Sequence, residues 1–229
     1  ALTCASMILE VQALTGRTGD TVLVDPTRIT RWLNEAQDRI ADTCPGLADL
    51  EYDDSTSLVT VEGQLIYALA DITCTDPTTE NQVCHLAEVY YIDGNDSAKL
   101  DFKPVDEFDE KWPCPTSPGY DKPHSWTLRS NKIELFPIPS SGYASKTLRV
   151  NLTRYPKDFS VITDNTDLCQ IEHVDEGLIN YATAQAWGAI GVEEKRILWQ
   201  TKWNEWLADY KVKSEAMLAW EEDNPFDLP

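Results

Sequence analysis

The feature that most constrains the fold is a change of hydrophobic periodicity along the chain. Both ends of the 229-residue sequence carry apolar residues at helical spacing, whereas residues 56–155 form short runs bounded by Gly, Pro, Asp or Asn. The two periods belong to different secondary structures, so the chain needs both. We therefore predict an α+β fold that is mainly α, in which a helical bundle from the two ends carries a small inserted antiparallel β region.

The predicted domain boundaries follow this change of period. Residues 1–55 and 156–220 are expected to form a discontinuous helical domain, residues 56–155 an inserted β-rich domain, and residues 221–229 a C-terminal arm. Within this scheme the acidic stretch LADLEYDDSTS (47–57) is expected to be a loop. The segment PVDEFDEKW (104–112) is expected to be a short helix, and the Pro-rich PCPTSPGYDKP (113–123) a projecting loop.

Two helices are predicted near the N-terminal end, over residues 3–15 and 26–44. Asp25 can cap the second helix and Pro26 suits its first turn. Its buried stripe is expected to consist of Ile29, Leu33, Ala36 and Ile40. On its other face, Arg31–Glu35 and Glu35–Arg39 have the spacing of helical ion pairs, which contribute only about 0.2–0.5 kcal/mol each.

The C-terminal third is predicted to be helical again. The stretch EHVDEGLINYATAQAWGAIG (172–191) is rich in Ala and Gly, so a neighbouring element can approach it closely. The last helix, roughly 192–220, has a heptad-like aromatic seam made by Trp199, Trp203, Trp206, Tyr210 and Trp220. The seam fits core packing within a bundle, and it also fits contact with another subunit, because Trp and Tyr are favoured at interfaces.

The sequence contains no recognisable catalytic or cofactor motif. Its six cysteines are scattered without a C-x-x-C pair and it has only three histidines, so neither a metal site nor a cofactor is expected. The net charge of -20 argues against gripping a nucleic-acid backbone. No stretch reaches the roughly 20 apolar residues of a membrane span. We expect no enzyme activity; a non-catalytic binding module for carbohydrate or protein is the main alternative, and a hydrolase using acidic residues ranks last.

Several stretches, in their order, resemble the head–tail adaptor (connector) proteins of tailed bacteriophages. RITRWLNEAQDRIA (28–41) looks like an early helix of that family, and GQLIYALAD (63–71) looks like its strand after a glycine, with Ala70 where a proline is expected. The most characteristic part is a strand ending in Pro-x-Pro, a turn, a strand into Tyr-Pro and an Asp-rich loop, which KIELFPIPSSG and KTLRVNLTRYPKDFSVITDNTD match. EGLINYATAQAW matches the helix that follows.

The resemblance implies a structural virion protein at the head–tail interface, made in the host cytoplasm. Such proteins form a ring, typically of twelve subunits, which docks beneath the portal protein, joins the capsid to the next tail component and lets DNA pass without sequence-specific binding. Within such a ring the expected contacts to neighbouring subunits or the portal are the C-terminal helix and arm, with Trp199, Trp203, Trp206, Tyr210, Trp220 and Phe226. Arg28 and Arg31 are expected to reach an acidic neighbour and offset repulsion between subunits.

Overall fold

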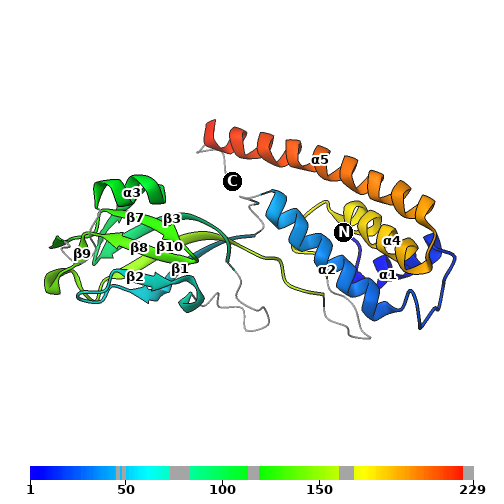
Figure 1. Cartoon of the computed structure of the whole chain (residues 1–229), viewed down its shortest axis with the longest axis horizontal. Helices are drawn as coiled ribbons and strands as arrows, with labels where there is room; N and C mark the ends of the chain where they lie inside the picture. The colour runs from blue at the N-terminus through cyan, green and yellow to red at the C-terminus, as the bar shows by residue number, and fades with distance from the viewer. Residues whose placement is uncertain (45–46, 48–49, 73–82, 113–118, 160–167, 224–229) are drawn as a thin grey trace. The chain divides into compact units, whose positions relative to one another are not determined.

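The computed structural model describes residues 1–44, 47, 50–72, 83–112, 119–159 and 168–223, and its chain forms two compact units (Figure 1). The helical unit consists of Ala1–Leu50 and Tyr155–Pro229, and the β unit consists of Glu51–Arg154. Each unit has its own buried core, so each is described separately.

The helical unit contains α1 (Cys4–Leu14), α2 (Pro26–Thr43), α4 (Asp175–Ile190) and α5 (Glu193–Asp223). Helix α4 is central, because α1, α2 and α5 all pack against it. Its residues 177–184 are buried, as its high content of small side chains allows. Gly191 adopts the left-handed conformation (φ 86°) that ends α4 and turns the chain into α5.

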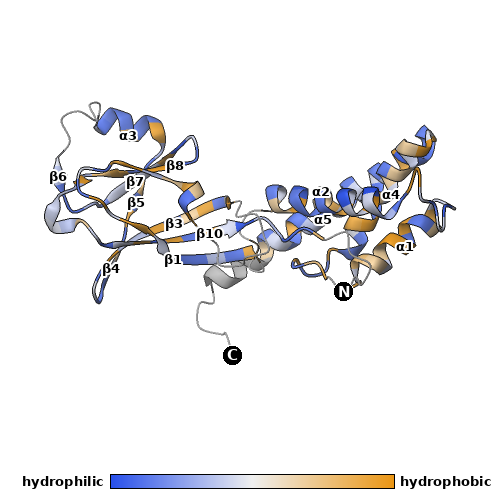
Figure 2. Ribbon diagram, turned by 90° about the horizontal axis from the view of Figure 1, so that it is seen from below, coloured by the Kyte–Doolittle hydropathy of each residue, from blue (hydrophilic) through white to orange (hydrophobic). Residues whose placement is uncertain are grey.

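Helix α2 begins and packs as its sequence predicts. The Asp25 side chain accepts a hydrogen bond from the Arg28 backbone N–H at 3.1 Å, and Pro26 occupies the first turn. The predicted stripe is fully buried: Ile29, Leu33, Ala36 and Ile40. The hydropathy of α2 alternates along its length, whereas α1 is mostly hydrophobic (Figure 2).

The ion pairs predicted on the outer face of α2 are wrong. Glu35 accepts a hydrogen bond from the hydroxyl of Tyr181 on α4 at 3.1 Å, and the Arg39 guanidinium lies over the same ring, 5.0 Å from its centroid. A tertiary partner therefore replaces the local pairs. Arg31 makes no hydrogen bond or ion pair with any residue that the structure describes, which leaves an exposed cation on α2.

The β unit contains two four-stranded sheets and a two-stranded one. The first sheet has the order β1-β10-β3-β4 and is antiparallel; its strands are β1 (Glu51–Val59), β10 (Thr147–Arg154), β3 (Val83–Asp93) and β4 (Asp96–Lys99). The second has the order β2-β8-β7-β5, with strands β2 (Ile66–Ala68), β8 (Lys132–Phe136), β7 (Ser125–Arg129) and β5 (Asp101–Phe102). Strands β6 (Tyr120–Asp121) and β9 (Ile138–Pro139) pair with each other, and α3 (Val105–Lys111) is the predicted short helix.

Both four-stranded sheets contribute to one hydrophobic core in the β unit. Tyr91 and Val150 from the first sheet lie in the same buried cluster as Trp126 and Leu135 from the second. Trp126 is 2% exposed and is the largest side chain in this core. The β unit therefore has its own hydrophobic core, built from both sheets.

The predicted fold class is wrong because it underestimates the size of the β region. The described residues form ten strands in three sheets besides five α-helices, so the chain is not a helical bundle with a small insertion. The sheets are not wholly antiparallel either, since β5 pairs with β7 and β6 with β9 in parallel. Two-residue strands such as β6 leave no alternating pattern in the sequence, and their parallel partners are not joined to them by a hairpin turn.

The acidic loop predicted at residues 47–57 is also wrong from residue 51 onward. Strand β1 begins at Glu51 and pairs with β10. Asp54 is 1% exposed, and its carboxylate accepts hydrogen bonds from the backbone N–H groups of Thr56 and Ser57. This turn-like pattern coincides with an irregularity in the register between Asp54 and Leu58, so the acidic residue forms a bulge rather than ending the strand.

Candidate functional site

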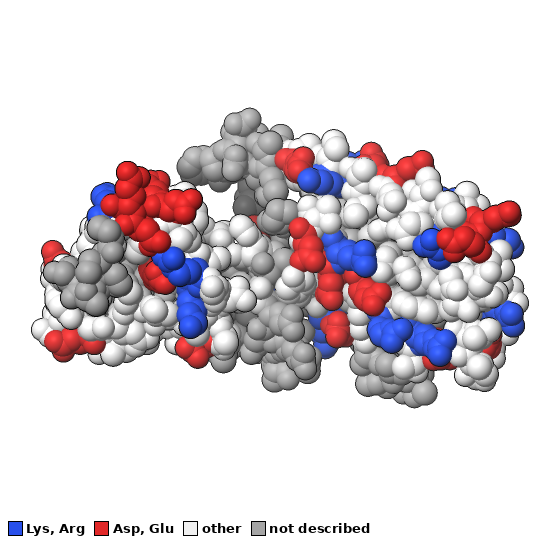
Figure 3. Space-filling model, in the orientation of Figure 1, with Lys and Arg blue, Asp and Glu red and all other residues white. Residues whose placement is uncertain are grey.

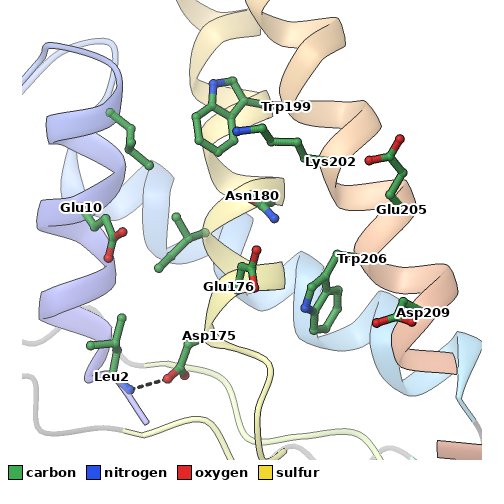
Figure 4. A pocket seen from close by; sticks show the side chains of 12 residues that line it. Leu2, Glu10, Asp175, Glu176, Asn180, Trp199, Lys202, Glu205, Trp206 and Asp209 are labelled. Atoms are coloured by element: carbon green, nitrogen blue, oxygen red, sulfur yellow. Dashed lines mark hydrogen bonds between the residues drawn. The ribbon is translucent and has the colours of Figure 1, made fainter. Parts of the chain in front are cut away.

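A groove of about 800 Å³ opens between α1, α4 and α5 within the helical unit (Figure 4). Its apolar lining comes from all three helices: Leu2, Leu14, Ile179, Trp199 and Trp206. Its carboxylates are Glu10, Asp175, Glu176, Glu205 and Asp209. Apolar surface combined with an excess of one sign of charge is typical of a surface that binds another chain.

The aromatic seam of α5 forms one wall of this groove. Trp203 is 2% exposed and packs edge-to-face on Tyr181 of α4, with ring centroids 5.2 Å apart. Trp206 stacks on Trp203 at 5.6 Å and on Tyr210 at 5.0 Å. The inner part of the seam is the buried Trp203. Its outer part consists of the half-buried Trp199, Trp206 and Tyr210, of which Trp199 and Trp206 line the groove.

A glycine on α4 lets α5 come this close. A Cβ atom built on Gly177 would lie 2.4 Å from the Trp206 ring, well inside van der Waals contact. No larger residue fits there unless the indole moves. The close approach expected from the Ala/Gly content of residues 172–191 thus occurs at this contact.

Two of the five groove carboxylates have a partner among the described residues, and three do not. Asp175 accepts a hydrogen bond from the backbone N–H of Leu2 at 2.6 Å, and Asp209 pairs with Lys213 at 2.6 Å. Glu10, Glu176 and Glu205 are exposed and have no hydrogen bond or ion pair with any other described residue. The one lysine of the lining, Lys202, lies over the Trp199 ring with its Nζ 4.0 Å from the centroid.

A buried amide lies among these carboxylates. Asn180 is 6% exposed, lines the groove, and forms no side-chain hydrogen bond within the described structure. Figure 4 shows its side chain on α4 between Trp199 and Glu176, on the side that faces α5. The amide lines the open groove, so a partner that enters the groove can hydrogen-bond to it.

The other predicted interface residues lie at several places. Arg28 is exposed and pairs with Asp25 at 3.4 Å, while Arg31 is exposed one turn further along α2. Tyr210 is half-buried at the end of the stacked row, and its hydroxyl donates to the Glu172 carbonyl at 3.4 Å. The side chain of Trp220 and all of Phe226, with the rest of the C-terminal arm beyond residue 223, lie outside the described residues.

An acidic cluster lies on α2 and the nearby residue Asp158. Burial raises the pKa of Asp38 to about 6, and the nearby carboxylates of Asp158, Asp42 and Glu35 raise it further in the same direction. Asp42 itself accepts a hydrogen bond from the Tyr155 hydroxyl at 2.5 Å. This cluster lies beside the 155–158 segment and is separate from the groove residues.

Neither a metal site nor a membrane helix is found in the described part of the chain. No group of three or more His, Cys, Asp or Glu side chains there has the geometry to hold a metal ion. None of the helices searched is both long and apolar enough to cross a membrane. Cys4 and Cys44 are buried, and the Cys169 thiol donates to the Gln37 Oε1 atom at 3.3 Å. Cys74 and Cys114 lie outside the described residues.

Comparison with known families decides what kind of protein this is. The model of the family described as SU10 adaptor protein matches residues 2–222, which include both units and the whole groove. The chain belongs to the SU10 adaptor protein family. This confirms the resemblance to phage adaptors and makes the protein a structural phage protein and a component of the virion. No curated protein matches the adaptor.

Proposed function

We propose that the adaptor forms a ring, typically of twelve copies, that docks beneath the portal protein, joins the capsid to the tail and forms part of the DNA channel. The observation that carries this proposal is the family match over residues 2–222, since a phage adaptor links one virion component to the next.

The net charge of the chain supports a channel through which DNA passes without tight binding to the wall. At a net charge of -20 per subunit, a ring of such chains carries a large excess of negative charge, which disfavours tight binding of the phosphate backbone. Figure 3 shows acidic side chains gathered over α3 and mixed acidic and basic side chains over the helical unit. We therefore propose a channel wall along which DNA slides.

The surfaces proposed for assembly are the outer part of the α5 seam and the exposed side of α2. Trp199, Trp206 and Tyr210 are half-buried in the helical unit and retain surface for a neighbour, and Arg31 is exposed on α2. Trp203 is covered within the unit, so we assign it a positioning role for the seam. Trp220, which precedes the C-terminal arm, and Phe226 within the arm remain proposed contacts to a neighbouring subunit or the portal.

Sedimentation velocity of the purified adaptor, alone and mixed with the portal protein of its phage, tests the proposal. We expect a complex of adaptor and portal that carries many adaptor copies, and no complex of the adaptor alone with duplex DNA, even at low salt. Tight adaptor–DNA binding would contradict the proposed channel wall. Failure to associate with the portal under all conditions would contradict the docking.

A further inference from the structure

We propose that the groove between α1, α4 and α5 receives the Arg31 side of α2 from a second copy of the chain. The proposal rests on the proposed ring and names the two surfaces that meet in it. It follows from unsatisfied groups on both surfaces and from their placement on different sides of the same helical unit.

The groove lacks positive charge to match its carboxylates. Glu10 projects from α1 and Glu205 from α5 on its two sides, with Glu176 on α4 between them (Figure 4). None of the three has a partner among the described residues, and Lys202 already lies over an indole ring. A cation that enters the groove is attracted by the excess negative charge of its lining.

Asn180 gives the groove a second requirement, independent of charge. The residue is 6% exposed, and its amide has no hydrogen bond within the described structure and lies on the groove side of α4. An arginine meets both requirements, because its five N–H donors can reach carboxylate and amide oxygens together. Its planar guanidinium also packs well on indole rings.

The chain itself supplies a suitable arginine at the start of α2. Residues 17–34 hold three arginines against two aspartates, so this segment is locally basic in a chain of net charge -20. Arg17 and Arg28 already pair with Asp20 and Asp25, at 3.9 and 3.4 Å. Arg31 is exposed and has no partner in the described part of the molecule, so it is the arginine of this segment free to enter a neighbour's groove.

The two surfaces are placed so that copies can join head to tail. Helix α2 packs against α4, and in Figure 4, which looks onto the groove, α2 passes behind α4. The groove and α2 therefore occupy different sides of α4. A contact between two different surfaces of identical subunits is heterologous, and it gives a ring when the rotation between neighbours closes and an open filament when it does not.

The charge of the groove argues against the chain's own C-terminal arm as its occupant. The arm EEDNPFDLP carries four acidic residues and no basic one, so the groove carboxylates would repel it. A basic segment of the portal is the competing occupant, and the experiment must distinguish it from a second adaptor copy.

Charge reversal with rescue tests the pairing directly. Arg31→Glu and the double change Glu10→Lys/Glu205→Lys should each raise the adaptor concentration needed for ring formation on the portal about tenfold or more. Combining all three changes in one chain should restore assembly, because the charges are exchanged across the contact. Lys132→Glu and the double change Glu62→Lys/Glu110→Lys make the same charge changes at exposed β-unit positions and should assemble normally.

The outcomes separate this inference from the proposed function. If the unmodified chain forms rings and all the charge variants do so equally well, the inference is overturned while the ring stands. If only the groove variant fails and Arg31→Glu assembles normally, the portal occupies the groove and the pairing is overturned. Loss of assembly in both variants without rescue in the combined variant also overturns the inference, provided that thermal unfolding shows that the variant monomers are folded. If the lysine double variant does not fold, Glu10→Gln/Glu205→Gln is tested in its place. An unmodified chain that never assembles overturns both proposals.

Discussion

Replacing Trp203 with alanine should destabilise the helical unit strongly, before any question of assembly arises. The indole is 2% exposed, so truncation leaves a cavity between α4 and α5 and removes the ring contacts at 5.2 Å to Tyr181 and 5.6 Å to Trp206. Buried Trp-to-Ala changes cost about 3–5 kcal/mol. Against a typical total of about 5–15 kcal/mol, this should lower Tm by roughly 10 °C in thermal unfolding followed by far-UV circular dichroism.

Trp199→Ala is the matched control, since it removes the same side chain from the same helix. Trp199 is half-buried and lines the groove, so we expect a loss of about 1 kcal/mol or less in the free energy of unfolding of the monomer. Its effect should appear in ring assembly instead. Equal losses of stability in the two variants, or a loss below about 1 kcal/mol for Trp203→Ala, would refute the assignment of an inner and an outer part of the seam.

Three further predictions concern the helical unit. The pKa of Asp38 is raised from 3.8 to about 6 in the folded protein, so its contribution to stability is greatest below about pH 4 and is lost as pH rises through about 6. Asp38→Asn should therefore stabilise the protein at neutral pH by about 1–2 kcal/mol, a figure reduced for solvent screening because the group is half-buried. Gly177→Ala should displace the Trp206 ring and cost about 1–3 kcal/mol, against the usual gain for Gly-to-Ala in a helix. Asn34→Ala should cost about 1–3 kcal/mol, because Asn34 accepts from the Phe159 N–H at 2.9 Å and donates to the Phe159 carbonyl.

Each of these has a measurement that decides it. Urea unfolding at several pH values should show a flatter pH dependence for Asp38→Asn than for the unmodified chain, and an unchanged slope would argue against the raised pKa. Gly188→Ala is the control for Gly177, because the Cβ would meet only the flexible Arg196 side chain, at 3.0 Å; equal stability of the two glycine variants would contradict the close packing at Trp206. An unchanged unfolding free energy in Asn34→Ala would show that water replaces the lost hydrogen bonds.

Local sequence signals predicted the helices well. The cap at Asp25, the proline at position 26 and the buried stripe of α2 depend on neighbouring residues and regular spacing, which a sequence displays directly. The aromatic seam of α5 was equally visible. Which part of it is buried was not, because that depends on Tyr181 and Gly177 in another helix.

Features that depend on distant residues were missed. The ion pairs expected from Glu35 gave way to Tyr181, 146 residues away, and the parallel pairing of β6 with β9 has no local signature. The groove joins carboxylates at residues 10, 176 and 205, each of which is ordinary in so acidic a chain. Only the three-dimensional arrangement shows that these carboxylates lack partners among the described residues and line the same groove as Asn180.

Native mass measurement of the adaptor assembled on its portal tests the central claim most directly. We expect a discrete closed complex whose mass corresponds to a fixed number of adaptor copies, typically twelve, per portal ring. A monomer alone would not decide the matter, because the portal can act as the template for assembly. An adaptor that stays strictly monomeric and ignores the portal under all conditions would contradict the account.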